Sequence, residues 1–315
     1  MSLATDTAAL PPPAASAVYL AGPREYFSLM KPRVMSLVVL TALAGMLIAP
    51  SSVHPIVGFA ALTAIAIGAG ASGALNMWWD ADIDGRMART RLRAIPSGLI
   101  DPKEALGFGL TLSFLSVLTL AAFVNFLSAA LLAFTIFFYL VIYTVWLKRR
   151  TPQNIVIGGA AGALPPIVGC AAASGQVTID SLWLFAIIFM WTPPHFWALA
   201  LVKARDYERV GVPMMPNAKG PARTRTEILI YSLLLAPLGL APWFTGAGGA
   251  LYGVAALVLG LGLWVHAARV YLVRDGVDAN KRAMALFGYS ILYLFALFGL
   301  LVVEHAFGLI ARWGL

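Results

Sequence analysis

The segment IVGFAALTAIAIGAGASGAL, residues 56–75, contains no charged side chain, and NMWWDADIDGRMARTR, residues 76–91, follows it directly. An uncharged run of this length is sufficient to cross the roughly 30 Å hydrocarbon core of a bilayer as a helix. The second segment places three aspartates within five residues, then several arginines. Carboxylates near lipid are energetically costly, so this cluster indicates a function at one end of a membrane helix.

The composition of the whole chain indicates a polytopic membrane protein. Of its 315 residues, 60% are hydrophobic and 11% are charged, against roughly 25% charged in soluble domains. We therefore expect an all-α fold with nine transmembrane helices. The nine apolar runs near the ~20 residues needed to span a bilayer lie at about 34–50, 56–78, 105–123, 126–147, 154–173, 181–202, 228–246, 250–272 and 285–305.

The basic residues that give the chain its net charge of +8 are distributed in agreement with the predicted topology. With nine spans, 21 of the 22 Lys and Arg residues fall on one side of the membrane. By the positive-inside rule this side, with the N-terminus, is cytoplasmic. The placement of the basic residues explains the net charge without a nucleic-acid partner. The connections on this inner side are also the long and polar ones, so we expect the active site to face the cytoplasm.

The N-terminal segment differs from the rest of the chain. Residues 1–25 include the Pro- and Ala-rich run ALPPPAASA, which predicts a disordered cytoplasmic tail before a single membrane domain at 26–315. The tail has neither the apolar core of a signal peptide nor the many arginines of a transit peptide. This favours a bacterial inner membrane over a mitochondrial one. Cys170 is the only cysteine, which excludes intrachain disulfides and cysteine metal clusters.

Three polar side chains after the second span share one helix face. Asn76, Asp80 and Asp84 are spaced i, i+4 and i+8, and residues four apart on a helix differ by only about 40° in direction. Acceptors stacked in this way repel one another unless a cation lies among them. Mg²⁺ prefers such oxygen ligands and binds through one or two carboxylates together with substrate phosphates. The spacing therefore predicts a Mg²⁺ site at these three residues.

Basic side chains on the same side are candidate ligands for a phosphate group. Arg89 and Arg93 lie four residues apart in the loop after the aspartates, and arginine pairs bidentately with phosphate oxygens. The two other arginines of the loop are better explained by topology and by attraction to anionic lipids. The further candidates at the inner ends of the first and fourth spans are Lys31, Arg33 and Lys148.

A second polar cluster, Lys203, Asp206 and Tyr207, follows the sixth span. The lysine can contact a phosphate, the aspartate a second cation, and the tyrosine can donate a hydrogen bond. A solvated helix end would have the same composition. The position of this cluster mirrors that of the first, at the inner end of another even-numbered span, and this favours a second half-site.

His195 lies inside the sixth span, in MWTPPHFWALAL. An ionisable residue within a membrane span is a functional candidate by default, with a role in binding or orienting an aromatic acceptor. The alternative is a neutral histidine bonded to a backbone carbonyl that Pro193 or Pro194 leaves free. The sequence leaves both interpretations open.

The motif N-x-x-x-D-x-x-x-D at Asn76, Asp80 and Asp84, followed by MARTR, resembles the intramembrane aromatic prenyltransferase superfamily. The match is closest to its protohaem IX farnesyltransferase (haem O synthase) family. Four blocks carry this finer resemblance: YFSLMKPRVMSLVVLT, YTVWLKRRTPQNIVIGGAAGALPPIVG, WTPPHFWALAL and DYERVGVPMMP. They run from about residue 26 to 217.

The resemblance implies a nine-helix bundle around a cavity that opens toward the membrane and the inner face. It implies transfer of the farnesyl group of farnesyl diphosphate to a vinyl group of haem B, giving haem O for terminal oxidases. The implied partners are these two substrates, the lipid bilayer, and haem A synthase or oxidase assembly proteins. Mg²⁺ is the implied cofactor, and the implied catalytic residues are Asp80, Asp84, Asp206, Tyr207 and His195.

Two departures from the superfamily pattern are relevant. The second motif offers Asp206 without a partner four residues away, which is also typical of the haem branch and favours haem over a quinone precursor. In the first loop Arg93 is followed by Ala94 instead of proline. The alternatives are a prenyltransferase acting on a quinone precursor or another aromatic ring, and a transporter. The near absence of charge at mid-depth in the spans argues against a transporter.

Overall fold

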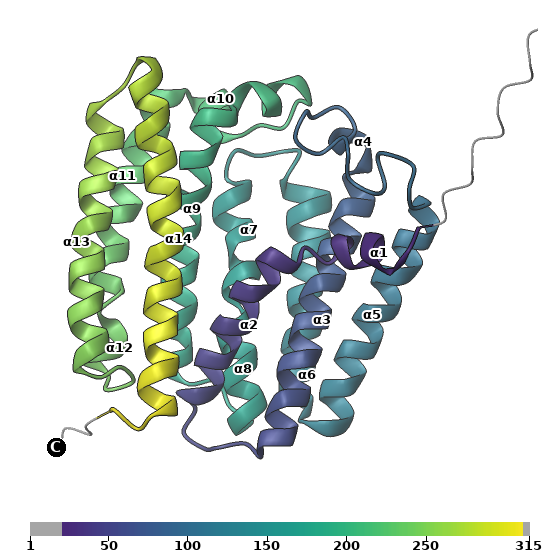
Figure 1. Ribbon diagram of the computed structural model, residues 1–315, viewed down its shortest axis with the longest axis vertical. Coiled ribbons are helices and arrows are strands. Elements are labelled where there is room, and N and C mark those ends of the chain that lie inside the picture. The colour runs from purple at the N-terminus through teal and green to yellow at the C-terminus, as the bar shows by residue number, and fades with distance from the viewer. Residues whose placement is uncertain (1–20, 311–315) are drawn as a thin grey trace, which may run out of the picture.

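The computed structural model describes residues 21–310, and throughout this range the regular structure is helical (Figure 1). The long helices form one bundle, as predicted. In chain order the helices are α1 (Pro23–Leu29), α2 (Pro32–Leu47), α3 (Pro55–Trp79), α4 (Ala81–Asp84), α5 (Pro102–Phe123), α6 (Phe126–Phe137), η1 (Phe138–Leu147), α7 (Asn154–Ala163), α8 (Pro165–Ser174), α9 (Ile179–Arg209), α10 (Met215–Lys219), α11 (Pro221–Leu238), α12 (Ala241–Phe244), α13 (Ala250–Leu272) and α14 (Gly276–Ala306).

The described residues contain eight or nine candidate membrane-spanning segments, against nine predicted. Eight helical segments are long and apolar enough to cross a bilayer, and α1 with α2, bent by 55°, supplies a ninth if the pair counts as one span. The all-α, multi-pass prediction is therefore confirmed. Residues 1–20, most of the predicted disordered tail at 1–25, lie outside the described residues, and 23–25 belong to α1.

Several helices extend beyond the apolar runs that predicted them. The connection between the apolar runs 181–202 and 228–246 is largely helical, because α9 continues to Arg209 and α11 begins at Pro221. Hydropathy locates only the part of a helix that lies in hydrocarbon, whereas polar turns at its ends remain helical in the headgroup region. The long helices α2, α3, α5 and α11 begin with proline in their first turn, where its missing N–H has no intrahelical partner to lose.

The fourth predicted span ends in a π-helix, η1, which continues α6. In its wider turn the hydroxyl of Thr144 donates to the carbonyl oxygen of Tyr139, five residues earlier, at 2.8 Å. The π-helix faces Tyr139 and Tyr143 into a cavity and Thr144 toward α3. Such helices are rare and occur often at functional sites.

Close packing of α2 against α8 positions the central part of the bundle. A Cβ added to Gly45 would overlap the backbone of Pro166, and one added to Gly169 would overlap the carbonyl of Ala42. Membrane helices associate through such small residues, because lipid provides no hydrophobic force between them. The broken span α7–α8 is thus held against α2 while α7 borders the cavity described below.

Candidate functional site

The predicted first cluster is buried where α3 ends. Asn76 lies in the last turns of α3, Asp80 is the residue between α3 and α4, and Asp84 ends α4. All three are buried. The Asn76 amide donates to Asp80 Oδ2 at 2.8 Å and to the Thr144 hydroxyl of η1 at 3.1 Å. The Nζ of Lys31 donates to Asn76 Oδ1 at 2.7 Å.

Asp80 keeps one carboxylate oxygen available. Its Oδ2 forms an ion pair with Lys148, at the end of η1, and accepts the Asn76 amide. Its Oδ1 is buried and has no hydrogen-bond partner among the described residues, and Arg149 Nη2 lies 3.7 Å from it. A buried, unpartnered carboxylate oxygen is costly, so this atom is a candidate ligand for a cation.

Asp84 is arranged in a similar way. Arg93 Nη1 lies 2.5 Å from Asp84 Oδ2, and the backbone carbonyl of Asp84 accepts the Thr90 hydroxyl at 2.9 Å. Each of the two buried carboxylates is therefore paired with the cation of a predicted phosphate ligand, Lys148 for Asp80 and Arg93 for Asp84.

Asp82 points away from the site, as expected for a residue two positions from both Asp80 and Asp84 on a helix. Its side chain is 54% exposed, against 1% for Asp80, and it accepts from both Nη atoms of Arg149 at 2.7 and 2.9 Å. These hydrogen bonds hold the pKa of the Asp82 carboxyl below its ordinary value. Asp82 therefore anchors the segment after η1 to α4 and leaves the buried carboxylates to the site.

A basic pocket of about 740 Å³ opens beside these carboxylates. It is formed by α1, the α1–α2 turn, the end of α3 and the loop after α4. Its cations comprise four of the predicted phosphate ligands and one residue that the sequence did not reveal: Lys31, Arg33, Arg89, Arg93 and Arg24. Lys31 adopts a left-handed backbone conformation, φ 53°, between α1 and α2, and its side chain faces Asn76.

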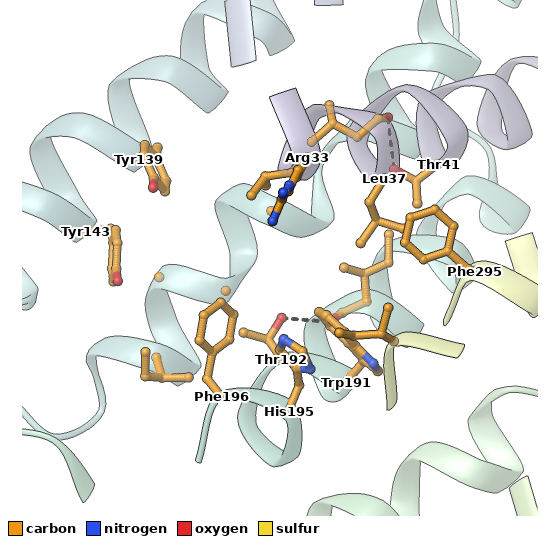
Figure 2. A pocket seen from close by; sticks show the side chains of 18 residues that line it. Arg33, Leu37, Thr41, Tyr139, Tyr143, Trp191, Thr192, His195, Phe196 and Phe295 are labelled. Carbon is orange, nitrogen blue, oxygen red and sulfur yellow. Dashed lines mark hydrogen bonds between the residues drawn. The ribbon is translucent and has the colours of Figure 1, made fainter. Parts of the chain in front are cut away.

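A second, apolar cavity of about 390 Å³ lies within the bundle. Figure 2 shows Arg33, Leu37 and Thr41 of α2 on one side of it and Trp191, Thr192, His195 and Phe196 of α9 on another. Tyr139, Tyr143 and Phe295 complete its labelled aromatic wall. Arg33 and Val34 border both spaces, so the basic pocket and the apolar cavity meet at the start of α2.

His195 is buried at the wall of the apolar cavity and is held on three sides. Its ring stacks on Trp191, with centroids 4.2 Å apart, and on Phe287, at 4.5 Å. Its Nδ1 is 2.7 Å from the Ser290 hydroxyl of α14. The partner of His195 is thus a side chain of another helix, and not a carbonyl that the prolines leave free.

The second predicted cluster stands apart from the first in its contacts. Lys203 is exposed at a kink in α9, and Asp206 forms an ion pair with Arg209 at 3.7 Å. Tyr207 is half-buried and packs against the larger apolar core. Between residues 21 and 310, neither a hydrogen bond nor an ion pair joins these three residues to Asp80 or Asp84.

The sequence analysis did not identify several residues of the site. Tyr139 and Tyr143 are four apart near the inner end of a span, a signal that could have placed them on one face, but aromatic residues there are equally typical of interfacial anchoring. Nothing in the sequence distinguishes Thr144, which holds Asn76, or Arg24, which comes from the short α1.

The carboxylates can hold a metal ion only with help from other ligands. No group of three or more His, Cys, Asp or Glu side chains converges anywhere in the described range. Mg²⁺ commonly uses one or two carboxylates, substrate phosphates and waters, which fits Asp80 and Asp84 beside a basic pocket. The arrangement therefore suits a diphosphate whose apolar chain enters the adjoining cavity, and this combination defines a class of intramembrane prenyltransferases.

Comparisons with known proteins agree with this class. The model of the UbiA prenyltransferase family matches residues 38–292, and the chain belongs to this family. It is 65% identical to the protoheme IX farnesyltransferase of Beijerinckia indica, over 93% of this chain and 92% of that one. It is 61% identical to the protoheme IX farnesyltransferase of Methylocella silvestris, over 94% and 93%. The resemblance seen in the sequence is confirmed.

Solved structures share the fold. The structure of a digeranylgeranylglyceryl phosphate synthase superposes with a TM-score of 0.73 at 15% identity, covering 89% of this chain and 98% of that one. A UbiA homolog from Archaeoglobus fulgidus, bound to GPP and Mg²⁺, superposes with a TM-score of 0.65 at 18% identity, covering 89% and 99%. At these low sequence identities, the similarity shows a shared fold.

Proposed function

We propose that the protein transfers the farnesyl group of farnesyl diphosphate to a vinyl group of haem B, producing haem O for terminal oxidases. One observation carries this proposal: the basic pocket beside Asp80 and Asp84 meets an apolar cavity at Arg33 and Val34. The two spaces match the two halves of an isoprenyl diphosphate. The identity of 57–65% to protoheme IX farnesyltransferases over nearly the whole chain supports haem as the acceptor.

Asp80 and Asp84 would hold Mg²⁺, with Asn76 beside them and Asp206 at a second ion. The orphaned Asp80 Oδ1 fits a hard cation. Asn76 Oδ1 accepts from Lys31, so ligation through this oxygen requires Lys31 to turn to the substrate. When bound, the ion supplies positive charge to the departing diphosphate.

The chain's own cations stabilise the leaving group. Lys31, Arg33, Arg89 and Arg93 line the basic pocket, and Lys148 lies beside Asp80. As the C1–O bond of farnesyl diphosphate breaks, both electrons leave with the diphosphate, and these side chains bind the charge that develops there. Lys203 and Tyr207 would reach the same group from the end of α9.

The apolar cavity protects the allylic cation until the acceptor reacts. The vinyl π electrons form the new C–C bond to farnesyl C1, and the cation left on the vinyl group takes the oxygen of a water molecule, which then loses a proton. Tyr139, Tyr143 and Trp191 line the cavity, exclude water from early capture and can stabilise the cation over their faces.

The site lies at the end of the bundle that holds most of the basic residues. From the positive-inside rule we infer that this end, with the N-terminus, faces the cytoplasm. We propose a bacterial inner membrane location, with release of haem O to haem A synthase or to oxidase assembly proteins.

The test is turnover with purified protein. Protein in detergent is incubated with haem B, farnesyl diphosphate and Mg²⁺, and haem O is measured by mass spectrometry. We expect haem O with the wild type and none after addition of a chelator or in Asp84→Asn. Prenylation of a hydroxybenzoate instead of haem would overturn the acceptor. No product with either acceptor, together with saturable Mg²⁺-independent flux in vesicles, would favour a transporter.

A further inference from the structure

His195 has no role in the chemistry described so far, although it is buried at the wall of the apolar cavity. Its Nδ1 and the Ser290 hydroxyl are 2.7 Å apart. That hydroxyl donates its only hydrogen to the carbonyl of Phe287, also at 2.7 Å. We assign the imidazole proton to Nδ1, because the hydroxyl can then accept from His195 while its own hydrogen goes to the Phe287 carbonyl.

This tautomer leaves a lone pair on Nε2. Among residues 21–310 no protein group makes a hydrogen bond to Nε2, whereas Nδ1 is satisfied. An imidazole whose Nδ1–H is held by a fixed acceptor, and whose Nε2 has no protein partner, has the arrangement of metal-ligating histidines, because the hydrogen bond sets both tautomer and ring orientation.

The ring cannot turn to another partner. Trp191 and Phe287 stack on it with interplanar angles of 18° and 23°. Trp191 is itself fixed, since its Nε1 donates to the backbone carbonyl of Ser290 at 2.7 Å. A ring clamped in this way loses little entropy when it binds a ligand.

One side of the cavity is formed by α7, through Ile155, Gly158, Gly159 and Gly162. Gly158 and Gly159 are packed against the side chains of Tyr143 and Thr192. A Cβ added to Gly162 would meet no atom within 4 Å, so the backbone there faces open space. A planar macrocycle can approach the backbone at Gly162 from the cavity, which Figure 2 shows between Arg33 and His195.

We propose that Nε2 of His195 binds the iron of the haem acceptor as an axial ligand. This inference rests on the proposed function, because it takes haem as the acceptor that shares the apolar cavity with the farnesyl chain. Iron is a preferred partner of neutral imidazole. Ligation fixes the macrocycle at α9 and orients its rim toward the junction at Arg33, where the farnesyl chain enters. His195 is thus a positioning residue, and through it the protein recognises the acceptor by its iron.

Binding spectra test the proposal without turnover. Haem B is titrated into purified protein and the absorption spectrum is recorded, with iron-free protoporphyrin IX as a second probe. In His195→Asn the amide nitrogen can still donate to Ser290, but nothing replaces Nε2. We expect this variant to lose the histidine-ligated spectrum, to regain it with added imidazole, and to bind haem at least about tenfold more weakly, ~1.4 kcal/mol.

The controls separate ligation from structure. Protoporphyrin IX should bind the wild type and His195→Asn equally, because it offers no iron. His266→Asn removes another stacked histidine, which lies on Tyr289 outside the cavity, and should leave the haem spectrum unchanged. An unaltered spectrum in His195→Asn, or equal weakening for haem and protoporphyrin, refutes the ligation. If the wild type forms haem O but His195→Asn keeps the wild-type haem spectrum, only the ligation is refuted. If the wild type shows a histidine-ligated spectrum but forms no haem O, only the proposed function is refuted.

Discussion

Asp80→Asn tests the paired-carboxylate site most directly, because it replaces one oxygen by nitrogen with little change of volume. Asp80 is buried, pairs with Lys148, and keeps Oδ1 without a partner. The substitution removes the charge that would hold the metal ion against the diphosphate. Loss of one preorganised electrostatic group costs about 10²–10³ in kcat, and we expect at least this loss.

Asp82→Asn is the matched control. It lies two residues away in the same motif, is exposed, and pairs with Arg149 instead of facing the site. Exposed ion pairs contribute about 1 kcal/mol or less, which corresponds to an effect of about fivefold at most. The assay is the initial rate of haem O formation at saturating substrates. Equal rates for Asp80→Asn and the wild type would contradict the metal-site interpretation.

The fold of Asp80→Asn needs its own measurement, because the substitution leaves Lys148 without its carboxylate. Breaking a buried pair costs about 3–5 kcal/mol, and since Lys148 is partly exposed we expect the lower end. Thermal unfolding in detergent reports this cost. The double variant Asp80→Asn/Lys148→Met removes the unpaired charge, so it should unfold closer to the wild-type temperature and still make no haem O.

Other residues lead to distinct expectations. Arg93→Gln should raise KM for farnesyl diphosphate at least about tenfold, because it removes a phosphate ligand and unpairs Asp84; an unchanged KM would exclude Arg93 from the pocket's function. Gly169→Val should lower the free energy of unfolding by about 1–3 kcal/mol, since its Cβ would overlap the Ala42 carbonyl, and an undiminished melting temperature would contradict that packing. Glu304→Gln should cost about 1–2 kcal/mol of stability without changing kcat, because the buried carboxylate accepts two backbone N–H groups at the start of α13, at 2.7 and 2.8 Å; a loss of kcat in a stable variant would oppose this assignment. Chelation of Mg²⁺ should stop haem O formation and leave the helical circular dichroism signal unchanged, and activity at excess chelator would argue against metal dependence.

The membrane architecture was predictable because its signal is local. Each span is a run of apolar residues, and the energy of placing such a run in lipid depends on that run alone. The second span was expected at 56–78 and is observed as α3, Pro55–Trp79. The first and last residues of a helix were harder to predict where the helix ends in polar residues. For example, α11 begins at Pro221 although its apolar run begins near 228.

The candidate site was only partly predictable. The i, i+4 spacing of Asn76 and Asp80 lies within one helix, and their hydrogen bond follows from it. The partners from elsewhere could be assigned to the same side of the membrane, but not to particular atoms. Arg24 and Thr144 carry no signal in the sequence that marks them as site residues.

By itself the sequence determined the nine apolar runs, the segregation of basic residues and the Asp motif, since each depends on neighbouring residues or on composition. Tertiary structure alone decided which helices meet: Lys148 reaches Asp80 across 68 residues, and Ser290 orients His195 across 95. The physical reason is that helix contacts in lipid depend on the fit of small residues and hydrogen bonds. That fit arises only when distant helices pack, as where Gly45 of α2 meets Pro166 of α8.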